Sequence, residues 1–155
     1  MPTVIIFVGT PTCGKTTFAN KLVKRGYTSV SRDAIRDLLF GTNYKQNPLD
    51  EKKVNRQQTY QIDCLIAQNK DVVLDNCHCS HKYIDEAIKP FKEAGYDIKI
   101  KFFDLIPLWK VIYRNIKRYV QTGHNFKFIP YKIIKRFREN YKKIDKSKYK
   151  EYDYV

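Results

Sequence analysis

Apolar positions along this chain alternate between short continuous runs and longer stretches with helical spacing. The continuous runs are typical of strands that are buried on both faces of a parallel sheet. We expect these strands at residues 3–8, 27–30, 72–75 and 97–103. Apolar residues at intervals of three or four predict helices at residues 15–24, 33–40, about 51–68, 83–92, about 108–119 and 131–144. This order predicts an α/β fold, with a parallel four-stranded sheet flanked by helices on both faces.

The length of 155 residues predicts a single domain over residues 1–155. Loops are expected at residues 41–48 and 121–130, and residues 146–155 are expected to form a frayed tail. The sequence shows no signal peptide or membrane span, and its four cysteines do not form a disulfide framework. We therefore expect a cytoplasmic protein that binds no membrane. The sequence leaves the oligomeric state open.

The residues after the first strand form a phosphate-binding loop. They read Gly-Thr-Pro-Thr-Cys-Gly-Lys-Thr at positions 9–16, the full G-x-x-x-x-G-K-T pattern between a strand and a helix. In such a loop the backbone N–H groups and the helix N-terminus bind a polyphosphate, and Lys15 reaches the β- and γ-phosphates. The Thr16 hydroxyl is placed to bind Mg²⁺. We therefore predict that the chain binds ATP, or another nucleoside triphosphate, with Mg²⁺.

The segment after the second strand carries a carboxylate and a guanidinium. Asp33 and Arg36 lie one turn apart, at the sheet edge where parallel α/β folds bind their ligands. Asp33 could orient an acceptor hydroxyl and take its proton, while Arg36 could grip a phosphate. These residues alone leave a second interpretation equally open, in which Ser31 or Asp33 caps the helix and Arg36 is a solvated surface residue.

The third strand ends in Asp75 and Asn76, and His78 follows. An acidic residue that ends an apolar strand beside a phosphate loop is commonly placed to organise Mg²⁺, usually through water. We therefore expect Asp75 to hold the metal together with Thr16. For His78 the sequence indicates either a turn residue or a substrate contact.

Positive charge is concentrated in the last third of the chain. Residues 110–155 hold 14 Lys and Arg against four Asp and Glu, whereas residues 1–109 hold 16 against 12. This surplus suits nucleic acid as a partner, with a solvated lysine-rich surface, including the basic helix 131–144, as an equal alternative. Lys110, Arg114 and Arg118 share one helix face that leads into a loop. That arrangement predicts a lid at about residues 114–130, with a basic surface helix as the alternative.

Taken together, these motifs resemble the 5′ polynucleotide kinase family, the kinase module of enzymes that heal nucleic-acid ends. The resemblance covers nearly the whole chain. G-T-P-T-C-G-K-T-T resembles the family's phosphate loop, S-R-D-A-I-R is similar to its acceptor motif, and L-D-N resembles the motif after its third strand. F-F-D-L-I-P-L-W-K-V-I-Y-R-N-I-K-R, followed by Ile129-Pro130, resembles its lid segment. A departure is the lid loop, which is long and contains Phe126 and Phe128.

The resemblance implies a P-loop kinase fold with an arginine-bearing lid, and transfer of the ATP γ-phosphate to 5′-hydroxyl ends of DNA or RNA. It implies four catalytic residues, which are Lys15, Asp33 as general base, Arg36 on the acceptor phosphate and Arg118 on the donor phosphates. The expected nucleotide-binding residues are Gly9, Thr10, Pro11, Thr12, Cys13, Gly14, Lys15, Thr16, Thr17, Arg114 and Arg118. The expected acceptor-binding residues are Arg32, Asp33, Arg36, Asp75, Asn76 and His78. Thr16 and Asp75 are expected to hold Mg²⁺.

Three other functions fit parts of the sequence. A small-molecule or nucleotide kinase shares the fold class, the loop and a lid. A GTP-dependent switch shares the loop but needs an N-K-x-D pattern, and Asn69-Lys70-Asp71 lacks the spacer. A nucleic-acid-binding module without catalysis fits the charge but leaves the phosphate loop and Asp33 unexplained.

Overall fold

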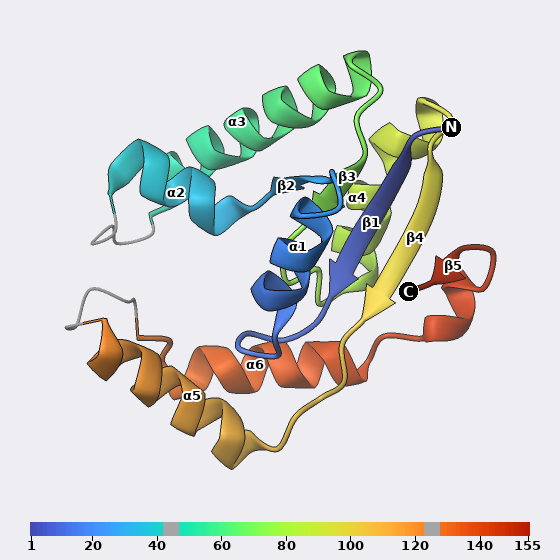
Figure 1. Cartoon of the computed structure of the whole chain (residues 1–155). Coiled ribbons are helices and arrows are strands. Elements are labelled where there is room, and N and C mark those ends of the chain that lie inside the picture. Colours follow the sequence, from blue (N-terminus) through green and yellow to red (C-terminus); the bar gives the residue numbers. More distant parts are fainter. Residues whose placement is uncertain (42–46, 123–127) are drawn as a thin grey trace.

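The computed structural model describes residues 1–41, 47–122 and 128–155 (Figure 1). Its centre is a five-stranded sheet in the order β2-β3-β1-β4-β5, in which all neighbouring strands are parallel. The strands are β1 (Thr3–Val8), β2 (Thr28–Val30), β3 (Val72–Leu74), β4 (Asp97–Phe102) and β5 (Asp153–Tyr154). The predicted α/β class is confirmed, but the sheet has a fifth strand that the sequence pattern did not predict.

Each predicted helix is present, and its ends differ from the prediction by at most three residues. The helices are α1 (Lys15–Val23), α2 (Arg32–Phe40), α3 (Pro48–Ala67), α4 (His81–Glu93), α5 (Leu108–Gln121) and α6 (Tyr131–Lys142). The largest difference is the start of α3, where the Asn47 side chain accepts a hydrogen bond from the Asp50 backbone N–H at 2.9 Å. Within the described ranges, no helix has both the length and the apolar composition needed to cross a membrane.

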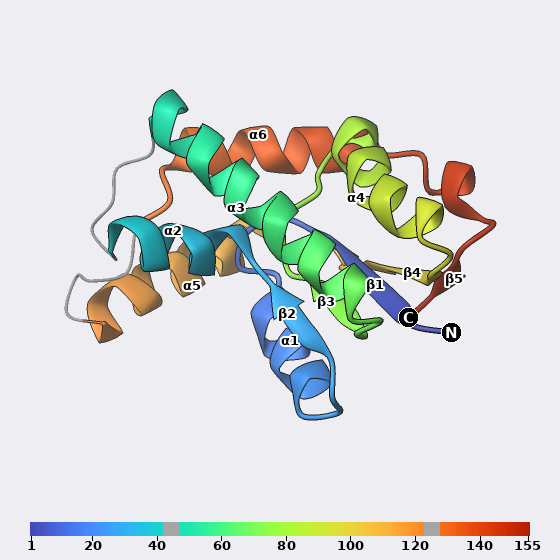
Figure 2. The same cartoon turned by 90° about the horizontal axis from the view of Figure 1, so that it is seen from above.

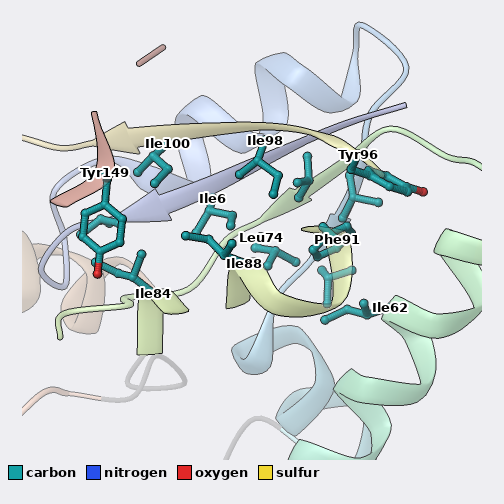
Figure 3. Close-up of a cluster of buried hydrophobic side chains, with 14 of the residues drawn as sticks. Ile6, Ile62, Leu74, Ile84, Ile88, Phe91, Tyr96, Ile98, Ile100 and Tyr149 are labelled. Atoms are coloured by element: carbon teal, nitrogen blue, oxygen red, sulfur yellow. The ribbon is translucent and has the colours of Figure 1, made fainter. Parts of the chain in front are cut away.

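Strand β1 shows why helices pack on both faces of the sheet. Its side chains alternate, so that Val4, Ile6 and Val8 join one apolar cluster while Ile5 and Phe7 join another. The first cluster is the larger one and contains side chains from α3, α4 and α6 (Figure 3). The second cluster lies under α1, on the other side of the sheet (Figure 2). Burial on both faces holds β1 in place beneath the loop that follows it.

The strand order brings several chain segments to one edge of the sheet. Val8 at the end of β1 pairs with Phe102 at the end of β4. Leu74 at the end of β3 pairs with Ile6 of β1 and with Val30 at the end of β2. Because all these strands run in the same direction, the phosphate loop, the start of α2 and the segment after β3 leave the sheet side by side.

The C-terminal residues are folded, which corrects the predicted frayed tail at residues 146–155. A short 3-10 helix, η1 (Lys146–Tyr149), follows α6, and β5 then adds to the edge of the sheet beside β4, with Lys99 opposite Asp153. The pattern missed this segment because its apolar surface comes from tyrosine rings instead of periodic aliphatic residues. A tyrosine buries its ring while its hydroxyl stays hydrogen-bonded.

A chain of hydrogen bonds attaches η1 to α4. The Asp145 backbone N–H donates to Nε2 of His81 at 3.1 Å, so the proton of the neutral ring lies on Nδ1. This Nδ1 lies 2.9 Å from the Tyr149 hydroxyl, which lies 3.1 Å from Oδ1 of Asp85. The buried Tyr149 ring also stacks on His81, and burial raises the pKa of its hydroxyl. The hydroxyl therefore stays protonated and can donate to Asp85.

We expect Tyr149→Ala to lower the free energy of unfolding by about 3–5 kcal/mol, because a buried aromatic ring is lost from the core. Tyr149→Phe keeps the ring and removes only the hydroxyl, so it should cost about 1–2 kcal/mol. Urea unfolding followed by circular dichroism measures both values. Equal stability of Tyr149→Ala and the unmodified protein would show that η1 is not part of the cooperative fold.

Candidate active site

The phosphate loop packs closely against the end of β4. A Cβ atom at Gly9 would lie 2.8 Å from the Cys13 sulfur and 2.9 Å from the Cβ of Phe103, so a side chain has no room there. Gly14 has a φ of +101°, in the left-handed region that glycine adopts without strain, and α1 begins directly after it. Packing therefore fixes one end of the loop and backbone conformation fixes the other. Such a preformed turn at a helix N-terminus is a binding site for anions.

Lys15 places its ammonium inside this loop. Its Nζ donates to the carbonyl oxygens of Thr10 at 2.7 Å and Gly9 at 3.2 Å, and the side chain is buried. Among the described residues, the hydroxyls of Thr10 and Thr12 are buried without a hydrogen-bond partner. Buried polar groups are rarely left unpaired, and phosphate oxygens would accept hydrogen bonds from both hydroxyls. The loop therefore suits a polyphosphate both by its charge and by its unpaired donors.

Thr16 and Asp75 provide oxygen atoms for a divalent cation. Asp75 follows β3 directly and is buried. Burial raises the pKa of Asp75 above its usual value, although a hydrogen bond with Thr16 and the charge of Lys15 act in the opposite direction. A hydroxyl and a carboxylate are ligands that suit Mg²⁺. The two residues therefore fit the predicted Mg²⁺ site, and a bound cation would favour the ionised form of Asp75.

The predicted acceptor residues form an ion-pair cluster where α2 and α3 begin. The Arg36 guanidinium donates from Nη1 to Asp33 at 2.6 Å, and from Nε and Nη2 to the two carboxylate oxygens of Glu51 at 2.8 Å each. Arg32 also donates to Glu51 at 2.8 Å. The Asp33 side chain is 90% exposed, whereas that of Arg36 is 16% exposed. The carboxylate of Asp33 is therefore accessible to a ligand, and the guanidinium of Arg36 is fixed in orientation.

This geometry combines the two interpretations that the sequence left open at α2. Ser31 caps the helix, with its hydroxyl accepting from the Ala34 backbone N–H at 3.5 Å. Arg36, however, is not a solvated surface residue, because ion pairs hold it. Ser31 is thus the residue that caps α2, whereas Asp33 and Arg36 form ion pairs.

Glu51 belongs to the site, although the sequence pattern did not reveal it. It lies in the first turn of α3, where an acidic residue is also favoured by the helix dipole, so its position had an ordinary explanation. Hydrogen bonds from Arg36 and, more weakly, from Arg32 lower the pKa of Glu51 to about 2 despite its partial burial. Glu51 is therefore ionised at neutral pH and orients both guanidinium groups. Residues 42–46 of the predicted loop 41–48, between the two helices, lie outside the described residues.

Asn76 and His78 support the backbone around the site. Oδ1 of Asn76 accepts from the Arg32 backbone N–H at 2.9 Å, and its Nδ2 is buried without a partner in the part of the chain that the structure describes. His78 carries its proton on Nδ1, because this atom lies 2.8 Å from the carbonyl oxygen of Phe7. Burial lowers the pKa of His78 to about 4, so the ring is neutral at pH 7. Contact of either residue with an acceptor stays a prediction.

Helix α5 lies on the other side of the phosphate loop (Figure 1). Nη1 of Arg114 donates to the carbonyl oxygen of Thr12 at 2.9 Å. Arg114 and Arg118 line a cleft of about 490 Å³ next to the loop. The other lining residues are Thr12, Cys13, Gly14, Thr17, Phe18, Lys21, Phe103, Lys117 and Gln121. The structure thus brings both predicted lid arginines beside the loop that they were expected to serve.

Ile129, near the end of the segment predicted as a lid, is hydrogen-bonded to α5. The buried Asn115 of α5 donates from Nδ2 to the Ile129 carbonyl oxygen at 2.8 Å and accepts from its N–H at 3.2 Å. Residues 123–127, including the predicted lid residue Phe126, lie outside the described residues. Asn115 therefore sets where the lid segment ends and α6 begins, and the lid itself stays a prediction.

The chain matches a protein family and a solved structure over most of its length. A family model described as an AAA domain matches residues 4–144. A search of curated proteins gives no match. A chain in the structure of the Pnkp1/Rnl/Hen1 RNA repair complex is similar over 93% of this chain, with 28% identity and a TM-score of 0.80. The match covers 46% of that chain, so the present chain spans less than half of its length.

Two kinases of small molecules share the fold. APS kinase CysC of Mycobacterium tuberculosis, solved with AMPPNP and APS, matches over 79% of this chain and 75% of its own, at 18% identity and a TM-score of 0.56. A gluconokinase from Sinorhizobium meliloti 1021 matches over 99% and 82%, at 17% identity and a TM-score of 0.60. At this level of identity only the fold is shared. The family match shows that the chain belongs to the AAA domain family, and the loop and the sheet give it the α/β P-loop fold.

Proposed function

We propose that this P-loop protein is a kinase that transfers the γ-phosphate of ATP to the 5′-hydroxyl end of a DNA or RNA strand. The observation that carries the proposal is the cluster of Asp33, Arg36 and Glu51, which starts from the same sheet edge as the phosphate loop. An accessible carboxylate next to an oriented guanidinium suits an acceptor that carries a hydroxyl and, on the same nucleotide, a phosphate. The similarity to a chain of an RNA repair complex supports the same class of acceptor.

On the donor side, the residues around the phosphate loop would bind ATP. The loop N–H groups and Lys15 would hold the β- and γ-phosphates. Arg114 lies against Thr12, and Arg118 lines the same cleft, so both can neutralise charge on the donor phosphates. Mg²⁺, bound through Thr16 and Asp75, would supply further neutralisation of the phosphate charge. The cleft next to the loop has room for the nucleoside part.

On the acceptor side, Asp33 would orient the 5′-hydroxyl and receive its proton. The hydroxyl oxygen forms the new bond to the γ-phosphorus, the bond to the β-phosphate oxygen breaks, and ADP leaves. Because phosphoryl transition states are loose, the proton can leave late and a carboxylate is a sufficient base. The charge of Asp33 also raises the pKa of Asp75, so the acceptor carboxylate lies within electrostatic reach of the metal site. Arg36 would bind the acceptor's first phosphate.

The distribution of charge supports a polyanionic acceptor over a small one. Residues 110–155 contain 14 Lys and Arg but only four Asp and Glu. This segment includes most of α5, which borders the nucleotide cleft. A small-molecule kinase, which the shared fold allows, has no need of such a surplus. Whether the acceptor is a polynucleotide or a small molecule can be tested by a direct phosphate-transfer assay.

With Mg²⁺ and γ-labelled ATP, we expect label to be transferred to 5′-hydroxyl oligonucleotides. The same strands bearing a 5′-phosphate, and nucleosides or sugars, should stay unlabelled. Asp33→Asn should keep ATP affinity within about twofold but lower transfer by at least about 100-fold, because general-base catalysis typically contributes 10²–10⁴-fold. Labelling of a metabolite but not of oligonucleotides would refute the proposed acceptor. Full transfer by Asp33→Asn would refute the role of Asp33.

Glu51→Gln should raise KM for a 5′-hydroxyl oligonucleotide about 10–100-fold and leave KM for ATP within twofold. Glutamine keeps the size of Glu51 but loses the charge that orients Arg36 and Arg32, and hydrogen bonds to charged groups contribute about 1.5–3 kcal/mol. Steady-state kinetics with each substrate varied in turn measures both constants. The control is Glu86→Gln on α4, which removes an exposed pair with Lys82 at 3.9 Å and should change neither constant. An equal rise in both constants for Glu51→Gln would contradict a role specific to the acceptor.

Affinity for a single-stranded acceptor should fall linearly on a log–log plot against salt concentration. Each phosphate neutralised by Lys or Arg contributes a slope of about −0.7. A titration of fluorescent oligonucleotides of increasing length, in the presence of ADP and Mg²⁺, should therefore give slopes that steepen with length up to a plateau. A slope independent of length would indicate that the protein contacts a single phosphate, as with a mononucleotide acceptor.

A further inference from the structure

Four large apolar side chains on α5 are exposed to solvent. Trp109 is 68% exposed, Tyr113 58%, Ile116 48% and Val120 62%. They are spaced by four, three and four residues, which places them within about 60° of arc on one side of the helix. Figure 1 shows α5 at the periphery of the molecule, beside α6. We call these four side chains the α5 stripe.

The four side chains of the α5 stripe belong neither to the core nor to the lining of the nucleotide cleft, although the neighbouring Lys117 lines that cleft. Val111 and Asn115 occupy the buried side of the helix. Arg114 points in a third direction, to the Thr12 carbonyl oxygen of the phosphate loop, and lies about 130° around the helix from the centre of the stripe at 100° per residue. Neither packing nor phosphate binding therefore accounts for large apolar residues at these four positions. An exposed apolar patch of this kind marks an interaction surface.

The spacing of the stripe fits the side of another helix. Alternating intervals of four and three residues are the a and d positions of a heptad repeat, through which two helices interlock their side chains. A helix that lies on a lipid surface has a wider apolar face than this arc of about 60°. A nucleic-acid strand would stack its bases on aromatic rings, but the second half of the stripe consists of Ile116 and Val120, which have no ring to stack on.

The charges along the edge of the stripe indicate what the other helix carries. If Trp109 is assigned to a d position and Tyr113 to the next a position, Lys110 and Lys117 fall on the flanking e positions. Both lysines are exposed. In an antiparallel pair of α5 helices these lysines would face each other and repel. In a parallel pair they would face Ile112 and Tyr119, with no charge to balance them. Pairing of two copies is thus disfavoured, and acidic residues are the complement to this edge.

We propose that the α5 stripe docks an amphipathic helix of a partner protein. This helix has apolar residues at heptad spacing and Asp or Glu along the edge that meets Lys110 and Lys117. The inference goes beyond the proposed kinase reaction, because none of the four stripe side chains lines the nucleotide cleft and only Lys117 at its edge is shared with the cleft.

Trp109 is the single tryptophan of the chain, so its fluorescence reports on the stripe directly. The probe is a designed tryptophan-free helical peptide of four heptads, with Leu at the a and d positions and Glu at the flanking positions. We expect it to shift the Trp109 emission to shorter wavelength with saturation at micromolar concentration. A peptide of the same apolar sequence with Lys at the flanks should bind at least tenfold more weakly. Raising the salt concentration should narrow this difference.

Two variants connect the binding to the stripe. Ile116→Ser with Val120→Ser keeps Trp109 as the reporter and should weaken binding of the Glu-flanked peptide at least tenfold. Tyr60→Ser removes an apolar side chain of similar exposure on α3 and should leave binding unchanged. Circular dichroism and ATP binding should be unchanged in both, because neither variant touches the core or the phosphate loop. Binding unaffected by the stripe variant would overturn the proposal, as would failure of the Glu-flanked peptide to bind.

Other occupants of the stripe give distinct results. Equal binding of the Glu-flanked and Lys-flanked peptides would reduce the stripe to a nonspecific apolar patch. A dimer detected by light scattering, and abolished by Ile116→Glu, would assign it to a second copy of the chain. A Trp109 shift caused by vesicles of phosphatidylcholine and phosphatidylserine, or by oligothymidine, and lost in the stripe variant, would assign it to lipid or to nucleic acid. Each of these three results contradicts a partner helix.

Discussion

The site depends on one constraint, which is that β1 is paired on both edges and buried on both faces. Pairing with β3 and β4 in parallel brings the phosphate loop beside Asp75, and the pairing of β3 with β2 adds the start of α2. Strand pairing alone thus brings residues that are far apart in the sequence to the same sheet edge, and it needs no contact between their side chains. The same burial gives the loop a rigid base. This matters because the buried Lys15 and the two threonine hydroxyls, which have no partner among the described residues, are arranged before any anion binds.

Electrostatic organisation sets the proposed acceptor side apart from the proposed donor side. On the donor side the charge of Lys15 is not balanced by its hydrogen-bond partners, because these are neutral carbonyl oxygens. On the acceptor side two arginines are balanced by Glu51, whose pKa falls to about 2, and by Asp33. A balanced cluster binds an anion less strongly than an open guanidinium, but it holds the guanidinium in one orientation. An oriented guanidinium would fix the acceptor's first phosphate, and with it the direction of the 5′-hydroxyl beside Asp33, whereas strong binding suits the substrate's more distant phosphates.

The sequence predicted the parts of this structure that depend on local pattern. The continuous apolar runs located the four main strands, and the loop motif located Lys15 and Thr16. The start of α3 was predicted three residues late, because the prediction followed the apolar spacing and not the local start signal of Asn47 and Pro48. Glu51 was missed because nothing in the pattern indicates which residue of α3 meets Arg36 across a connection. The C-terminal strand was missed for a similar reason, since β5 is held by the edge of the sheet and by Tyr149, contacts between residues far apart in the chain.

Helix α5 shows how three requirements share one rigid element. Asn115 fixes its position through Ile129, Arg114 joins it to the phosphate loop, and the stripe that contains Trp109 faces outward. A ligand that shifts the helix from either side therefore acts on the other side as well. Linkage makes this effect reciprocal: the factor by which an occupied stripe changes the affinity for nucleotide equals the factor by which nucleotide changes the affinity of the stripe. The hydrogen bond from Arg114 to Thr12 is a contact through which such coupling would pass, because it connects the helix directly with the loop backbone.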